Sequence, residues 1–329
     1  MECNVLITSA SRKVSLVKSF QEALYKENGG KVISVDINPL SSSLYFSDEA
    51  YIVPKSNEKK FIPALLDICK KESVSIIIPT RDEELSVFAN NKDKFEKIGT
   101  KVMIASPKTI EICNDKIKFI EFCKENSIPI PKTYSKKDID DVDTKFPLFI
   151  NDRFGKGSKN TFKVENKKEL KFFINKIEDP VIQEFCKEKE YTIDLFVDFS
   201  GKVISIIPRE RIATFCGESF VAKTYKNKII IDEVINLTKK LNLIGHNTIQ
   251  CFFDGKNVKF IEVNPRYGGG ANLGFFAGAN TPHFLIKILQ NKKIKYKIDE
   301  FKEGLIMLRH TEDIFIDNSD IKNVKSYGQ

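Results

Sequence analysis

A hairpin predicted around residue 255 carries oxygen-bearing side chains at a spacing that suits a metal ion. The segment TIQCFFDGKNVKFIEVNP predicts two strands joined by an Asp-Gly turn. Glu262 and Asn264 are two positions apart on the second strand, so both side chains point to one face, and Gln250 on the first strand can lie beside them. Carboxylate and amide oxygens are the hard donors that Mg²⁺ prefers, usually together with substrate phosphates. The spacing therefore predicts a Mg²⁺ or Mn²⁺ site held by these three side chains.

The residues directly after this hairpin could bind a phosphate group. Arg266 follows Pro265, which ends the strand, and a planar guanidinium is a natural partner for phosphate. The run YGGGANLG comes next, and glycines let backbone N–H groups approach an anion closely. Two polar residues at i and i+2 would by themselves indicate only the polar face of a hairpin. With an arginine and three glycines attached, a metal and phosphate site is the better interpretation.

The loop INDRFGKGSKN at 150–160 is a second candidate for phosphate binding. It follows the apolar run FPLFI and holds two glycines, Lys156 and Ser158, a composition that suits a phosphate cradle. It matches neither the GxxxxGK[ST] pattern of a P-loop nor the GxGxxG pattern of a dinucleotide site. The loop alone therefore does not say which residues would hold a nucleotide.

The elements that must position these residues begin with an alternation of short apolar runs and amphipathic segments. Strands are predicted at 4–8, 31–36, 50–54, 75–79 and 101–105, and helices at 14–26, 61–71 and 82–95. This alternation predicts a parallel, doubly wound α/β domain with its ligand site beyond the carboxyl ends of the strands. The turn TSASRK after the first strand lacks GxGxxG, so NAD binding is not predicted.

Acidic residues follow two of these strands. Asp36 ends the second strand, and a lone acid there is more often a turn residue than a ribose ligand. Asp82, Glu83 and Glu84 follow the fourth strand within TRDEE at 80–84. Acids in the first turn of a helix complement the helix dipole, so a helix start is the preferred interpretation and a ligand site the alternative.

The pattern changes near residue 112, where we place a domain boundary. Beyond it, helices mix with antiparallel hairpins, which predicts an α+β fold. The segment EYTIDLFVDFSGKVISIIPRERI predicts a hairpin that turns at Ser-Gly, and its second strand carries Arg209 and Arg211. The segment IIIDEVINLTKKLNL predicts a helix before the hairpin that carries Glu262.

The composition is that of an ordinary globular chain of 329 residues, with 41% hydrophobic and 30% charged residues. The formal net charge of +8 comes from scattered lysines, so a nucleic-acid partner is not expected and anionic ligands are favoured. Seven cysteines, without a CxxC pair, favour reduced thiols. The N-terminus lacks a signal-peptide pattern and no apolar run approaches the ~18 residues of a membrane span, so we expect a cytoplasmic protein.

Several motifs together resemble the ATP-grasp superfamily. Gln250, the segment IEVNPR and the run GGGANLGFFAGANTP are similar to the single-module carboxylate–amine ligases that resemble the carbamoyl phosphate synthase large subunit. The first domain resembles the Rossmann-like domain that precedes the grasp, and NDKIKFIEFCKENSIPIPKT resembles the entry into the grasp. The resemblance implies a pre-ATP-grasp domain at 1–112, an N-terminal grasp part at 113–184 with its lid at about 130–184, and a C-terminal grasp subdomain with the tail at 185–329.

For the nucleotide, the resemblance implies ATP with Mg²⁺ or Mn²⁺ as cofactor. Lys116 would contact the phosphate and the base, and the backbone from Glu184 through Phe185 to Cys186 would read the adenine edge. Glu190 would bind the ribose hydroxyls. Gln250, Glu262 and Asn264 would be the metal ligands, and Arg266 would touch the transferred phosphoryl group as the catalytic residue.

For the substrate, the resemblance implies a site between the first domain and the glycine run. For Arg209 and Arg211, a structural ion pair and a ligand role are equally open. The residues expected near the substrate are Arg12, Glu84, Arg209, Arg211, Tyr267, Gly268 and Gly269.

One position departs from the family pattern. Relatives carry a cation before the glycine loop, in a phrase similar to FPLVVKPRxGxGS, whereas this chain has FPLFINDRFGKGS with Asn151 at that position. An asparagine cannot neutralise a phosphate, and three explanations stand. Arg153 or Lys156 supplies the charge; or the loop amides around Gly157, together with Ser158 and the metal, hold the phosphates more weakly; or the site binds nucleotide without turnover.

The resemblance implies an ATP-dependent carboxylate–amine ligase that forms an amide through an acyl phosphate and releases ADP and phosphate. Its partners would be a small carboxylate and an amine, in surface-polysaccharide or small-peptide biosynthesis, and the chain could form a homodimer. Two alternatives are a regulatory or scaffolding protein that binds ATP but has little activity, and a grasp-type kinase that stops at the phosphorylated product.

Overall fold

The N-terminal domain is a parallel sheet covered by helices. The computed structural model describes residues 3–135, 145–157, 160–215 and 217–327. The sheet order is β16-β3-β2-β1-β4-β5, and every pair is parallel. Its elements are β1 (Asn4–Thr8), α1 (Val14–Lys26), β2 (Val32–Asp36), β3 (Glu49–Ile52), α2 (Phe61–Lys71), β4 (Val74–Ile78), α3 (Asp82–Glu96) and β5 (Lys101–Val102). The central strand β1 is almost wholly buried, as expected where helices cover both faces, and the predicted α/β domain is confirmed.

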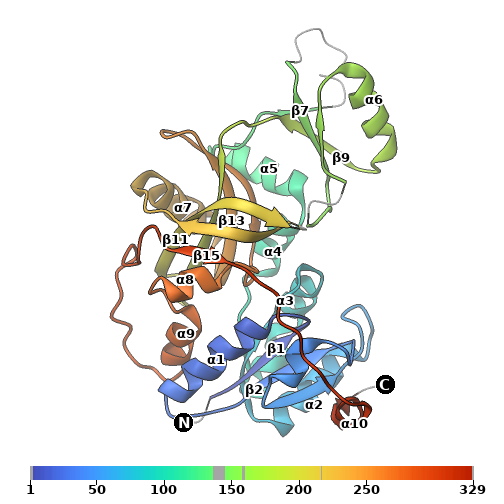
Figure 1. Ribbon diagram of the computed structural model, residues 1–329, viewed down its shortest axis with the longest axis vertical. Coiled ribbons are helices and arrows are strands. Elements are labelled where there is room, and N and C mark those ends of the chain that lie inside the picture. The colour runs from blue at the N-terminus through green and yellow to red at the C-terminus, as the bar shows by residue number, and fades with distance from the viewer. Residues whose placement is uncertain (1–2, 136–144, 158–159, 216, 328–329) are drawn as a thin grey trace.

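The end of the chain returns to this first sheet. The prediction assigned 185–329 to the C-terminal subdomain, but β16 (Lys325–Ser326) pairs with the edge strand β3. Tyr327 packs edge-to-face on Tyr51, with ring centroids 5.6 Å apart. Figure 1 shows the red tail descending from the upper domains past α10 (Asn318–Asn323) to the blue sheet. The tail therefore covers an edge that would otherwise be open to pairing with another strand.

The second sheet is antiparallel and forms the base of the predicted nucleotide site. Its order is β14-β13-β10-β11-β12-β15, so after β12 the chain crosses to the other side of β10, where it builds the β13–β14 hairpin. The helix α7 (Lys228–Leu241) packs its apolar side on this sheet, with Val234 and Leu237 wholly buried. The strands are β10 (Lys189–Val197), β11 (Val203–Phe215), β12 (Glu218–Thr224), β13 (Gly245–Phe253), β14 (Val258–Asn264) and β15 (Ile306–Leu308).

A small third sheet, in the segment predicted to be the lid, has a core of its own. Its order is β6-β9-β7-β8, and it joins the rest of the chain at both ends of its segment. In Figure 1 it stands away from the two larger sheets. Its core includes Leu148, Ile150 and Leu170, each fully buried. The elements are β6 (Thr133–Tyr134), β7 (Leu148–Asp152), β8 (Phe162–Val164), α6 (Lys167–Lys176) and β9 (Pro180–Glu184).

Two short helices link the first domain to the grasp. The helix α4 (Pro107–Asn114) begins with Ser106 as its N-cap and runs across the boundary predicted at residue 112. The helix α5 (Lys116–Glu125) begins directly after it, and the carboxylate of Asp115 accepts from the backbone N–H groups of Ile117 and Lys118. This N-cap fixes the position of Lys116, the first residue of the helix.

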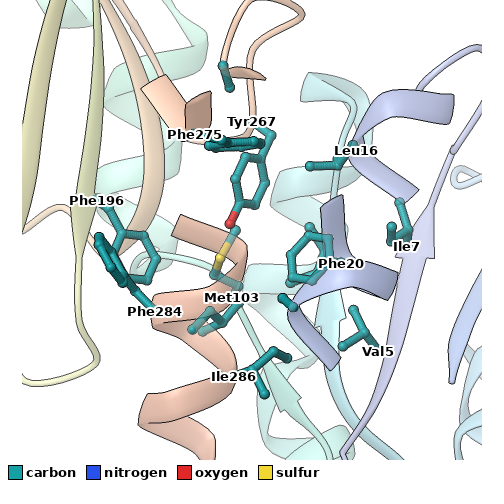
Figure 2. Packing of buried hydrophobic residues seen from close by; sticks show 14 of the residues in the cluster. Val5, Ile7, Leu16, Phe20, Met103, Phe196, Tyr267, Phe275, Phe284 and Ile286 are labelled. Carbon is teal, nitrogen blue, oxygen red and sulfur yellow. The ribbon is translucent and has the colours of Figure 1, made fainter. Parts of the chain in front are cut away.

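A shared apolar core fixes the N-terminal domain against the grasp domain. Phe20 on α1 packs edge-to-face on Tyr267, with ring centroids 5.8 Å apart, and Figure 2 shows both with side chains from either domain around them. The helix α9 (Thr281–Leu289) lies along α1. Gly245 has φ +74°, and a Cβ there would lie 2.6 Å from the side chain of Met103, so this position needs glycine. The core holds the two domains on either side of a cleft.

Candidate active site

The hairpin of β13 and β14 brings the three predicted metal ligands together. Gln250 lies directly opposite Glu262, and Thr248 lies opposite Asn264, so the predicted shared face is confirmed. The Nδ2 of Asn264 donates to Glu262 Oε1 at 2.8 Å, and the Nε2 of Gln250 donates to Glu190 Oε1 at 2.6 Å. Because both amide nitrogens are engaged, both amide oxygens are left as acceptors.

This donor set fits a cation that shares its coordination with phosphate. Among the described residues, no group of three His, Cys, Asp or Glu side chains could hold a metal ion by itself. Glu262 supplies one carboxylate, with Gln250 and Asn264 as neutral oxygen donors beside it. Mg²⁺ is usually held by one or two carboxylates together with substrate phosphates, and these residues meet that requirement.

Arg266 is fixed by an acid from the other domain. Its Nε donates to Asp82 Oδ1 at 2.8 Å and its Nη2 donates to Asp82 Oδ2 at 2.7 Å. Its Nη1 donates to the carbonyl of Tyr267 at 3.3 Å. Burial alone would raise the pKa of Asp82, but the guanidinium beside it holds that pKa below its usual value. Both groups are therefore charged at neutral pH, and the arginine is held in one orientation.

One cleft of about 220 Å³ joins the residues of the hairpin, the lid loop and the glycine run. Glu262, Asn264 and Arg266 line it together with Lys156 and Arg209. Further lining residues are Asp82, Gly157, Arg211, Ser219, Thr248, Gln250, Gly268, Gly269 and Gly270. The cleft therefore brings metal-type donors together with arginines and the glycine run Gly268–Gly270.

Arg209 forms a structural ion pair and also lines the cleft, so its ligand role stays a prediction. Its Nε donates to Asp194 Oδ2 at 2.9 Å, and its Nη1 donates to Ser219 Oγ at 2.7 Å. The residue is only 2% exposed and lines the cleft. A Cβ on Gly270 would lie 2.8 Å from the Arg209 Cζ, so glycine lets the loop backbone lie directly against the guanidinium. The guanidinium therefore lies against the backbone of the glycine run at the lining of the cleft.

Arg211 lies on the same strand and is bound to the predicted ribose ligand. Its Nη1 donates to Glu190 Oε1 at 2.7 Å, and its Nη2 donates to the carbonyl of Gly217 at 2.9 Å. Because Glu190 also accepts from Gln250, this carboxylate joins the arginine to the metal-type donors. The ribose role of Glu190 stays a prediction.

The lid loop carries two cations, Arg153 and Lys156, that could replace the cation expected at position 151, and only Lys156 lines the cleft. Arg153 forms a bidentate pair with Asp115, with Nε–Oδ1 and Nη2–Oδ2 distances of 2.8 and 2.6 Å, so its charge is committed to the start of α5. Lys156 lines the cleft, and its Nζ lies 3.8 Å from Asp82 Oδ2. Asn151 is 9% exposed and accepts from the Thr161 hydroxyl. Lys156 is therefore the better candidate for the phosphate cation.

Lys116 and the glycine loop contact each other directly. The Nζ of Lys116 donates to the carbonyls of Gly155 at 2.5 Å and of Asp152 at 3.1 Å. A small cavity between them is lined by Lys116, Lys156 and Glu262, so the lysine lies at the base of the lid loop as a nucleotide ligand would require. The predicted contact of Ser158 with phosphate lies outside the described residues.

The hinge between the lid and the large sheet is held by ion pairs. The carboxylate of Glu184 accepts from Lys259 Nζ at 2.8 Å, and its backbone N–H donates to the carbonyl of Lys132. The adenine edge would therefore be read by the backbone beyond Glu184, at Phe185 and Cys186. Burial raises the pKa of the Cys186 thiol to about 11, so this thiol is protonated at neutral pH.

Three predicted substrate residues do not line the cleft. Glu84 is 1% exposed and accepts from the hydroxyls of Thr8 and Ser9, so its carboxylate joins α3 to the first strand. Tyr267 is 1% exposed and stacks on His246 in the core between the domains. Arg12 is exposed on the loop after β1. The side chains of Glu84 and Tyr267 face buried partners, which sequence spacing does not show, and a substrate contact for either residue stays a prediction.

Sequence reasoning missed the cleft roles of other residues. Asp82 was explained as a helix start, yet it pairs with Arg266, and Ser219 was not singled out, although it binds Arg209. Arg309, just after β15, contacts the carboxylate of Glu218 and the carbonyl of Gly269. Only Asp82 had a sequence signal, since it follows a strand end in a parallel sheet.

Comparison with known families matches both halves of the chain. Residues 5–103 match the family model of the PylC-like N-terminal domain, and residues 113–270 match that of the ATP-grasp domain. The carbamoyl phosphate synthase large chain of Clostridium acetobutylicum is 27% identical over 304 residues, which cover 85% of this chain and 28% of that relative. The same protein of Thermoplasma volcanium is 23% identical over 308 residues, covering 85% and 29%. The chain thus spans less than a third of these relatives.

Solved structures share the fold at low identity. The biotin carboxylase domain of 2-oxoglutarate carboxylase from Hydrogenobacter thermophilus has a TM-score of 0.72 and 16% identity, covering 93% of this chain and 74% of that chain. N5-carboxyaminoimidazole ribonucleotide synthetase from Thermotoga maritima has a TM-score of 0.66 and 20% identity, covering 92% and 78%. The predicted ATP-grasp fold is confirmed. Among the described helices, none has both the length and the apolar character of a membrane span.

Proposed function

Residues 113–270 match the ATP-grasp domain, and on that premise we propose that the chain is an ATP-dependent carboxylate–amine ligase. A carboxylate attacks the γ-phosphate of ATP to give an acyl phosphate and ADP. An amine then attacks the acyl carbon, and phosphate leaves as the amide forms. The observation that carries this proposal is the cleft that brings together the metal-type donors, Arg266 and Arg209.

The phosphate end of the reaction is assigned to the hairpin and the lid loop. Gln250, Glu262 and Asn264 would hold Mg²⁺, which supplies charge neutralisation for the β- and γ-phosphates when bound. Arg266 donates to the phosphoryl group as negative charge develops on its oxygens, and Lys156 donates from the lid side. The lid loop covers the reacting atoms and limits the access of water to the acyl phosphate.

The carboxylate end is assigned to Arg209 and the glycine run. Arg209 is held by Asp194 and Ser219, so its orientation is fixed before the acid arrives. The loop from Gly268 to Gly270 lies beside it and can add backbone N–H donors to the carboxylate oxygens. Catalysis by positioning and electrostatics suits this site, since its cations are fixed by charged or polar partners.

The test is ADP release from Mg·ATP against a panel of acids crossed with a panel of amines. The panel holds amino acids and sugar acids, since amide formation in small-peptide or surface-polysaccharide synthesis is the favoured setting. Release that requires both an acid and an amine, with an amide detected by mass spectrometry, is the expected result. Full ADP release without any amine would indicate a kinase. ATP binding without turnover for every acid would indicate the regulatory alternative.

A further inference from the structure

A single buried carboxylate connects three parts of the molecule. Asp82 is the first residue of α3 in the N-terminal domain and is 7% exposed. Its two oxygens accept from Nε and Nη2 of Arg266, which belongs to the grasp domain. Lys156 of the lid loop brings its Nζ to 3.8 Å from the same carboxylate. Asp82 therefore contacts both cations that the proposed function assigns to the transferred phosphoryl group.

The start of α3 does not need this carboxylate for capping. The carboxylate of Glu84 accepts from the backbone N–H groups of Thr80 at 2.7 Å and of Arg81 at 3.1 Å. Glu83 supplies a further negative charge in the first turn and is exposed, in a pair with Arg81. Glu83 and Glu84 already supply negative charge to the helix start. Burying the Asp82 carboxylate costs free energy, and its pair with Arg266 is what offsets that cost.

The pair leaves part of the guanidinium for a ligand. A guanidinium has five N–H groups, and three of those of Arg266 have partners among the described residues: two donate to Asp82 and one to the carbonyl of Tyr267. The other two can donate to a phosphoryl oxygen in the cleft that Arg266 lines. Asp82 can therefore keep the arginine in place while the arginine acts.

We propose that Asp82 is a positioning residue for phosphoryl transfer and acts through Arg266. The inference rests on the proposed function, because it gives Arg266 the reacting phosphoryl group. Asp82 fixes the plane of the guanidinium, because Nε and Nη2 of Arg266 both donate to it. The N-terminal domain thus contributes to a phosphate site whose ligands lie on the grasp.

The test compares Asp82→Asn with the matched control Glu83→Gln, which neutralises the next acid in the same helical turn. Misplacing a reacting group by about 1 Å can cost about 10²-fold in rate, so Asp82→Asn is expected to lower kcat by about that factor. The KM for ATP should stay within about threefold, because the nucleotide has other contacts. Glu83→Gln should match the wild type in both constants. A rise in KM with an unchanged kcat would overturn the proposal.

A double-variant cycle shows whether Asp82 acts through the arginine. In the background of Arg266→Ala, Asp82→Asn is expected to lower kcat no further. An additional loss of the same size in that background would overturn the proposal. Asp82→Glu keeps the charge but moves it by one methylene, and it is expected to lower kcat while the melting temperature stays close to that of the wild type. Wild-type kcat in a folded Asp82→Glu variant would count against precise positioning.

A binding readout separates this proposal from the proposed function. Calorimetry would measure Mg·ADP binding with and without aluminium fluoride, which mimics the phosphoryl group in transfer and needs no acid substrate. Asp82→Asn is expected to lose affinity for the aluminium fluoride complex while Mg·ADP affinity stays the same. Equal affinities for the aluminium fluoride complex in Asp82→Asn, Glu83→Gln and the wild type would overturn the role of Asp82. Failure of every acid to support turnover would instead count against the ligase assignment.

Discussion

The β13–β14 hairpin and the lid loop at 151–157 form two sides of the proposed phosphate site, yet they hold their side chains in different ways. On the hairpin, strand register places Gln250 opposite Glu262, and the amide of Asn264 donates to the same acid. In the loop, Arg153 turns away to Asp115 at the start of α5, and Lys156 is left beside the cleft. Donors on strands follow from backbone pairing, whereas loop cations depend on which acids lie near them.

The largest effect should come from the arginine that follows the hairpin. Arg266→Ala is expected to lower kcat by about 10²–10³-fold, as the loss of a single preorganised donor to developing charge typically does. Steady-state ADP release with the active acid and amine would measure it. The control is Arg81→Ala, which removes an exposed arginine at the N-cap of α3 and should keep the wild-type rate. A loss below fivefold in a folded Arg266→Ala variant would contradict the catalytic role.

The second effect tests the metal donors on the hairpin. Glu262→Gln keeps the shape of the side chain but removes the one carboxylate among the three donors. A contact to a charged group is worth about 1.5–3 kcal/mol, so affinity for an ATP analogue with Mg²⁺ should fall about 10–100-fold. Binding without Mg²⁺ should hardly change, and calorimetry with and without the ion would measure both. Magnesium-dependent binding that survives undiminished would show that the metal assignment is wrong.

The hairpin could be predicted from the sequence because short-range rules decide it. A period of two places Glu262 and Asn264 on one face, and a shift in the strand pairing between Gln250 and Cys251 brings Gln250 opposite Glu262. The parallel N-terminal sheet followed in the same way from the alternation of strands and helices. By contrast, Asp82 and Arg266 are 184 positions apart, and no local pattern links them. The packing of Tyr267 on the distant Phe20 and His246 could not be predicted for the same reason.

The third effect compares the two cations of the lid loop. Lys156→Ala is expected to weaken binding of an ATP analogue about fivefold, since a partly exposed charge pair is worth up to about 1 kcal/mol. Arg153→Ala should leave that affinity within about twofold, because its guanidinium is bound to Asp115. It should instead lower the melting temperature, since the Asp115 carboxylate is buried and would lose this partner. Calorimetry and thermal unfolding of both variants would measure the two effects.

The opposite outcome of that pair would revise the assignment of the loop. If Arg153→Ala weakened nucleotide binding and Lys156→Ala did not, the Asp115 pair would have to open when ATP binds. The loop would then differ from the hairpin more strongly, because Arg153, the cation that binds phosphate, would lie outside the cleft until the nucleotide binds. Wild-type affinity in both variants would remove the lid loop from the phosphate site.

The smallest effect tests the departure at Asn151. This side chain lies on β7 and accepts from the Thr161 hydroxyl within the lid. Asn151→Lys restores the charge that similar ligases carry and is expected to tighten binding of an ATP analogue about two- to fivefold. The gain should depend only weakly on salt, because a charge at a position that is 9% exposed is screened less than one at the surface. Asn151→Ala is the control: it removes the bond to Thr161 without adding charge, so it should lower lid stability and leave nucleotide affinity no tighter. Equally tighter binding of the ATP analogue in Asn151→Lys and Asn151→Ala would mean that the loss of the asparagine, and not the added charge, causes the gain. A cation at this position of β7 would then not contribute to phosphate binding.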